Sequence, residues 1–154
     1  MRNTILWVVV GSCCALGGPL PAEETGPIEF LNSGRVLPAG LPFSEAVRVG
    51  DLLYLSGQIG IVPGTLTLVP GGIEEEARQT MANIRTSLEA HGFSMSDLVK
   101  CTVMLADISE WPAFNEIYRS ALSEPYPARS ALGVNGLALG ARVEVECIAA
   151  VGGP

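Results

Sequence analysis

The sequence has 154 residues, of which 48% are hydrophobic and 16% are charged. This is enough apolar material for one packed core. The formal net charge of −7 disfavours a nucleic-acid partner, because proteins that bind a phosphate backbone usually present a basic surface. No apolar run reaches the roughly 18 residues that a membrane-spanning helix needs. We therefore expect one ordered domain and no membrane span.

The N-terminus has the layout of an export signal. Arg2 precedes an apolar stretch at residues 5–16, and a Gly-Gly-Pro sequence then breaks it. The pattern predicts a signal peptide over residues 1–22, cut after Ala22, or a lipoprotein signal with Cys13 as the lipidated residue. A buried first helix or strand is the alternative, and the glycines disfavour it. We therefore expect an exported protein, periplasmic or secreted.

Two cysteines, Cys101 and Cys147, remain after such a leader is removed. Both lie in strand-like runs. The interpretation we favour is a pair of buried free thiols, and a disulfide is the alternative in an oxidising compartment. The single histidine, His91, and the absence of any CxxC motif predict no metal site.

The first half of the chain predicts a tether, a hairpin and a helix. Residues 23–41 are proline-containing and irregular, so we expect a tether or edge segment there and a folded domain over residues 42–154. Two apolar runs flank the turn pair Gly50 and Asp51 and predict a β-hairpin. Three acidic residues from Glu74 open a helical pattern, and Gly92 is its expected C-terminal cap; the apolar or small positions of that pattern are Ala77, Met81, Ile84 and Leu88.

The second half predicts a strand at residues 98–105, a second helix, and two further strands at residues 128–134 and 141–151. Asp107 or Ser109 is the expected cap of the second helix, whose apolar stripe is Phe114, Ile117, Tyr118 and Ala121. The final strand alternates, with Val143, Val145, Cys147 and Ala149 on one face. The order β-β-α-β-α-β-β predicts an α+β fold with two helices on one face of the sheet. The other face is then free for association with further copies.

Arg129 is the first candidate for a functional residue. It lies in a stretch with no acidic residue between Glu124 and Glu144, and its planar guanidinium matches a carboxylate ligand. An arginine near a strand start that pairs with a structural acid is the alternative. The role of Glu144 is equally ambiguous, because a carboxylate on the polar face of a strand is commonly solvated.

Five segments together resemble the RidA/YjgF family of reactive-imine deaminases, and they follow one another in the family's order. They are LYLSGQIG (53–60), LVPGGIEEEARQTMANI (68–84), VKCTVMLADISEWPAFNEIY (99–118), YPARS (126–130) and RVEVECIA (142–149). The resemblance implies a chorismate-mutase-like subunit with a mixed sheet. It also implies a homotrimer in which the sheets form a central barrel, with three clefts between the subunits.

The resemblance also implies the roles of individual residues. Arg129 corresponds to the arginine that binds the substrate carboxylate, and Glu144 to the glutamate associated with the attacking water. Gly57, Ala131, Asn115 and Phe43 correspond to residues of the same substrate-binding pocket.

The sequence departs from the family's pattern at three places. Phe43 stands where the family often has a tyrosine, and Ala131 where many bacterial members have a cysteine. A Leu-Ala pair at residues 137–138 replaces the frequent Leu-Pro pair.

These correspondences predict a deaminase that hydrolyses 2-imino acids or their enamine tautomers to 2-oxo acids and ammonia, with no metal and no cofactor. The alternative is a trimeric module that binds small carboxylates, or acts as a holdase, without catalysis. A ribonuclease, an activity sometimes attached to the family, is disfavoured by the acidic charge and the single histidine.

Overall fold

A computed structural model describes residues 26–151 of the chain. The predicted signal peptide lies outside the described residues. The strands are β1 (Ile28–Leu31), β2 (Ala46–Val49), β3 (Leu52–Leu55), β4 (Gln58–Ile59), β5 (Leu98–Leu105), β6 (Ala128–Gly133) and β7 (Val143–Ala150). The helices are α1 (Ile73–Ala90) and α2 (Trp111–Ala121), with short 3-10 helices at Met95–Asp97, Ile108–Glu110 and Ala138–Gly140.

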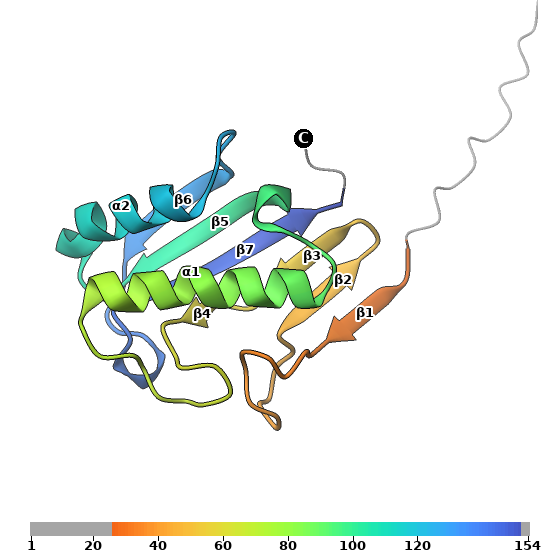
Figure 1. The fold of residues 1–154 in the computed structure, drawn as a ribbon, viewed down its shortest axis with the longest axis horizontal. Helices are drawn as coiled ribbons and strands as arrows, with labels where there is room; N and C mark the ends of the chain where they lie inside the picture. The colour runs from red at the N-terminus through yellow and green to blue at the C-terminus, as the bar shows by residue number, and fades with distance from the viewer. Residues whose placement is uncertain (1–25, 152–154) are drawn as a thin grey trace, which may run out of the picture.

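The strands form one mixed sheet in the order β1-β2-β3-β7-β5-β6, and the short strand β4 also pairs with β7. Among the strands of residues 26–151 only β5 and β6 pair in parallel, and α2 connects them. Both helices lie side by side on the same side of this sheet (Figure 1). The α+β fold with two helices on one face of a mixed sheet is therefore confirmed.

Local sequence signals account for the predicted hairpin and the first helix. The hairpin pairs Val49 with Leu52, and Gly50 takes the positive φ of 58° that its turn requires. At the end of α1, the amide of Gly92 donates to the carbonyl of Glu89 and the amide of Phe93 to that of Leu88. These two hydrogen bonds form a Schellman motif, so Gly92 ends the helix as predicted.

The second helix begins differently from the prediction. The side chain of Asp107 accepts a hydrogen bond from the amide of Ser109, which caps the 3-10 helix at Ile108–Glu110. The α-helix α2 then starts at Trp111, with Pro112 in its first turn, where a missing amide proton costs nothing.

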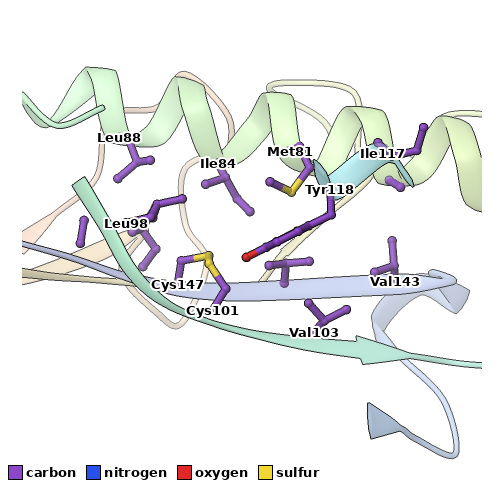
Figure 2. Packing of buried hydrophobic residues seen from close by; sticks show 14 of the residues in the cluster. Met81, Ile84, Leu88, Leu98, Cys101, Val103, Ile117, Tyr118, Val143 and Cys147 are labelled. Carbon is purple, nitrogen blue, oxygen red and sulfur yellow. A yellow bond between two sulfur atoms is a disulfide. The ribbon is translucent and has the colours of Figure 1, made fainter. Parts of the chain in front are cut away.

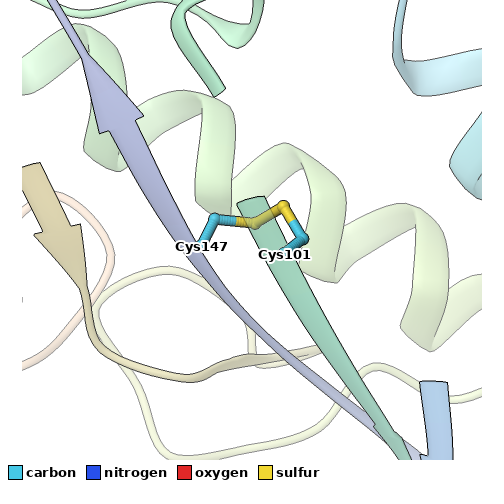
Figure 3. The surroundings of a disulfide bond; sticks show 2 residues. All are labelled: Cys101 and Cys147. Carbon is cyan, nitrogen blue, oxygen red and sulfur yellow. A yellow bond between two sulfur atoms is a disulfide. The ribbon is translucent and has the colours of Figure 1, made fainter. Parts of the chain in front are cut away.

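Cys101 and Cys147 form a disulfide between the neighbouring strands β5 and β7 (Figure 3). The interpretation of two free thiols is therefore wrong. The two residues are register partners with their Cα atoms 4.2 Å apart, a pairing that the sequence alone does not reveal. The disulfide lies between α1 and the sheet, among the residues of the core (Figure 2).

Two strands were not predicted. The strand β1 adds an edge to the sheet in the region that we expected to be a tether or edge segment, before the predicted domain start at residue 42. The strand β4 has only two residues, Gln58 and Ile59, and it exists because β7 runs beside it.

The face of the sheet opposite the helices carries apolar side chains in rows. Phe30, Val47, Tyr54 and Ile148 are successive cross-strand partners over four strands. Phe30 is 72% exposed and Tyr54 is 43% exposed in the single chain. An apolar surface of this kind is typical of a contact with another protein chain.

Candidate active site

Arg129 faces the helices from β6, the edge strand of the sheet. Its parallel partner on β5 is Cys101, whose side chain points into the core, so Arg129 points to the same side. The guanidinium donates a hydrogen bond of 2.9 Å to Oδ1 of Asn115 on α2. In the part of the chain that the structure describes, Arg129 has no ion-pair partner. Its positive charge is therefore available to an anionic ligand.

The guanidinium of Arg129 contacts two aromatic rings of α2. Its central carbon lies 4.7 Å from the ring centre of Tyr118 and 5.5 Å from that of Trp111. Both are cation-π distances, and they restrict the orientation of the planar group. Burial raises the pKa of Tyr118, and the charge of Arg129 offsets part of that effect. Tyr118 therefore stays neutral.

Arg129 lines two open cavities. One of about 580 Å³ is lined by Ile108, Ser109, Trp111, Pro112, Arg129 and Ala131. A second of about 270 Å³ is lined by Asn115, Tyr118, Arg119, Tyr126, Pro127 and Arg129. The structure thus brings together three of the predicted site residues, Arg129, Asn115 and Ala131. The first cavity is large enough for a small organic acid.

Glu144 and Gly57 form a second group. A Cβ atom built on Gly57 would overlap Oε1 of Glu144 and would lie 2.8 Å from its carboxyl carbon. A residue with a side chain at position 57 would therefore displace the carboxylate. Burial, and then the charge of Glu146, raise the pKa of Glu144 above its ordinary value. A carboxylate with a raised pKa is a stronger base.

The two groups lie on opposite faces of the sheet within one chain. Glu144 pairs with Met104 on β5, whereas Arg129 pairs with Cys101, three residues earlier on that strand. Because side chains alternate between faces, an odd separation places them on opposite sides. Phe43 lies apart from both groups, on the lining of a cavity formed by residues 32–45.

Sequence reasoning did not single out Trp111 or assign Tyr118 to the site. A signal was present, because Trp111, Asn115 and Tyr118 are spaced i, i+4 and i+7 and so share one face of α2. Among residues 26–151 no group of three or more His, Cys, Asp or Glu side chains could hold a metal ion. No helix in this range is long and apolar enough to cross a membrane.

Comparison with known families gives a match over most of the chain. Residues 35–151 match the family described as endoribonuclease L-PSP. The chain belongs to this family, the RidA/YjgF family. The resemblance identified from the sequence segments is therefore confirmed.

Several relatives in the RidA/YjgF family are named as enzymes. A goat protein named 2-iminobutanoate/2-iminopropanoate deaminase is 45% identical over 111 residues, which are 72% of this chain and 81% of that protein. The human protein of the same name is 43% identical over the same shares.

Solved structures in the family share the fold. RidA from the Antarctic bacterium Psychrobacter sp. has a TM-score of 0.75 and 39% identity, and the match covers 80% of this chain and 99% of that one. Escherichia coli TdcF, solved with bound serine, has a TM-score of 0.72 and 28% identity over 79% of this chain and 98% of its own.

Proposed function

We propose that this RidA/YjgF protein is a deaminase that hydrolyses 2-imino acids, or their enamine tautomers, to 2-oxo acids and ammonia. The observation that carries the proposal is the guanidinium of Arg129, which has no ion-pair partner among the described residues and faces an open cavity. Relatives named 2-iminobutanoate/2-iminopropanoate deaminase support the choice of reaction. The serine bound to TdcF is an amino acid and so carries the carboxylate that Arg129 would recognise.

Arg129 orients the substrate. Its guanidinium offers two parallel N–H donors to the two oxygens of a carboxylate, while Asn115, Trp111 and Tyr118 fix its plane. Binding the acid end places the neighbouring C=N carbon at a defined position. Orientation of this kind supplies much of the rate acceleration when the reaction itself is simple.

Glu144 acts as the general base and then as the general acid. Water adds to the carbon of the protonated imine while the carboxylate accepts a proton from that water. The same carboxyl group then protonates the carbinolamine nitrogen, and the C–N bond breaks as the hydroxyl group gives its proton back to the carboxylate. That proton passes to the departing ammonia, so the products are a 2-oxo acid and ammonium. Protonated imine and water are thus converted to ketone and ammonium in balance, and the raised pKa of Glu144 suits it to both transfers.

A complete site requires more than one subunit. Arg129 and Glu144 face opposite sides of the sheet in one chain, so Glu144 of one subunit must approach Arg129 of a neighbour. We propose a homotrimer in which the apolar face of each sheet packs against the others. The exposed side chains of Phe30 and Tyr54 on that face support this assembly.

A binding module without turnover is the competing function. It would use the same Arg129 cavity for small carboxylates and would not need Glu144. The names of the relatives favour the enzyme. A ribonuclease is disfavoured by the net charge of −7, which repels a polyanion.

The test is a coupled assay. An amino acid oxidase generates 2-imino acids in solution, a nucleophilic trapping reagent competes for them, and 2-oxo acid release is followed with and without the protein. We expect the protein to accelerate release, and Arg129→Ala to abolish that effect. Arg78→Ala is the matched control, because Arg78 lies on the exposed side of α1 in ion pairs with Glu74 and Glu75. Binding of a 2-oxo acid by the wild type with no acceleration would favour the binding module.

We also propose that the protein is exported. The leader pattern at residues 1–22 supports this, and so does the disulfide, since disulfides persist mainly in oxidising compartments. N-terminal sequencing of fractions from a bacterial host distinguishes cleavage after Ala22 from lipidation at Cys13. Intact Met1 on the protein of the cytoplasmic fraction would contradict export.

A further inference from the structure

Glu45 is a buried carboxylate that the proposed reaction does not use. It is 1% exposed and immediately precedes β2. Its oxygens accept hydrogen bonds of 2.7 Å from the amide of Ser33 and 2.5 Å from the hydroxyl of Ser87 on α1. Nε2 of His91, the only histidine of the chain, lies 3.4 Å away at the end of the same helix. The Glu45 side chain thus connects a loop to Ser87 of α1 by a hydrogen bond and lies beside His91 just after the end of that helix.

The loop in question is residues 32–45, the connection between β1 and β2. Its two ends are tied to each other: the amide of Ser33 donates to the Glu45 side chain, and the amide of Glu45 donates to the side chain of Asn32. Between these ends the loop encloses a cavity of about 320 Å³, lined in part by Phe43 and Glu45. Val36 is its one fully buried apolar anchor. The amide of Gly64 donates to the carbonyl of Val36 in the middle of the loop, and the polar contacts of Glu45 attach its C-terminal end.

The same contacts reach the catalytic carboxylate. The hydroxyl of Ser56 donates to the carbonyl of Ser44, and the amide of Ser56 donates to the carbonyl of Glu45. The next residue, Gly57, lies against the carboxylate of Glu144. A continuous set of contacts therefore runs from α1 through Glu45 and the loop to the candidate site.

We propose that Glu45 is a positioning residue, which ties the loop at residues 32–45 to α1 and so holds Phe43 in place. Within one chain Phe43 lies apart from Arg129 and Glu144, and in the proposed trimer it would reach the substrate site between subunits. The part that concerns substrate rests on the proposed function and on the assignment of Phe43 to the site. The attachment of the loop to α1 through Glu45, called the Glu45 tether below, does not depend on either.

The chemistry of the surroundings keeps Glu45 charged in this position. Burial alone raises the pKa of a carboxyl group, but hydrogen bonds from Ser33 and Ser87 and the nearby His91 outweigh it and hold the pKa of Glu45 below its ordinary value. An ionised carboxylate accepts stronger hydrogen bonds than a neutral amide does. Replacing it by glutamine keeps the size of the side chain and weakens the tether.

The test compares Glu45→Gln with Glu89→Gln in the full-length protein. Glu89 lies on α1 close to His91 but is exposed, so its variant removes the same charge without touching the loop. Hydrogen exchange should become at least about tenfold faster at residues 32–44 in Glu45→Gln, and should not change in the control. With imine substrates, KM should rise about tenfold while kcat stays within about twofold, because Arg129 and Glu144 are untouched. Ser87→Ala, which removes one donor, should shift both readouts in the same direction by less.

Two results would overturn the proposal. Unchanged exchange at residues 32–44 would show that Glu45 does not tether the loop, and a uniform rise across the sheet and helices would reduce its role to general stability. A fall in kcat with KM unchanged would remove Glu45 from substrate positioning. If the wild-type protein hydrolyses no imine, the proposed function fails, and the exchange measurement still decides whether the tether exists.

Discussion

Reducing the disulfide should destabilise the protein strongly. The bond joins residues 46 positions apart, and closing a loop of that length in the unfolded chain lowers its entropy by about 13.5 cal/mol/K, which corresponds to about 4 kcal/mol at 25 °C. This is a large fraction of the roughly 5–15 kcal/mol that stabilises a typical domain. The expected effect is a fall in Tm of roughly 10 °C or more.

The measurement is thermal unfolding of protein refolded with and without a thiol reductant, followed by circular dichroism. The double variant Cys101→Ala/Cys147→Ala is the control, because its Tm should be low under both conditions and insensitive to reductant. Labelling of the denatured, unreduced protein with a thiol reagent should modify neither cysteine. Equal Tm values for reduced and oxidised wild type would refute the reasoning, since the bond would then not constrain the unfolded state.

Two further predictions concern the carboxylate of Glu144. Gly57→Ala should abolish most imine hydrolysis without unfolding the protein, because the added Cβ atom overlaps Oε1 of Glu144. Measurements of activity and circular dichroism on the same sample check this. Full activity in the variant would contradict the contact between Gly57 and Glu144. In a pH profile of kcat, the rate should fall as pH drops through the raised pKa of Glu144, because only its ionised form accepts a proton. Glu146→Gln removes a neighbouring negative charge, so this acid limb should move to lower pH, and a limb that stays fixed or moves upward would exclude Glu144 as the base.

The elements that sequence reasoning predicted well are those whose signals are local. The hairpin at Gly50 and the end of α1 at Gly92 depend on positive φ angles that glycine adopts readily. The alternation of β7 follows from burial of one face, and Val143 and Val145 are fully buried there. Each of these features is decided within a few residues of chain.

The features that the sequence did not reveal depend on pairing between distant segments. β4 is a strand only because β7 lies beside it, and Cys101 meets Cys147 only in the register of β5 and β7. The candidate site shows the same division. Arg129 and Glu144 were singled out in the sequence and given their roles by the family resemblance, but their placement on opposite faces of the sheet follows from strand register. That placement is what makes assembly part of the proposed mechanism.

Subunit complementation tests the central claim most directly, namely that Arg129 of one subunit and Glu144 of another form one hydrolytic site. Arg129→Ala and Glu144→Gln should each be inactive alone. Refolded together in equal amounts, they should recover roughly a quarter of the wild-type rate, because about three quarters of random trimers are mixed and each mixed trimer holds one intact site in three. No recovery in mixed trimers whose assembly is verified by mass would contradict the account.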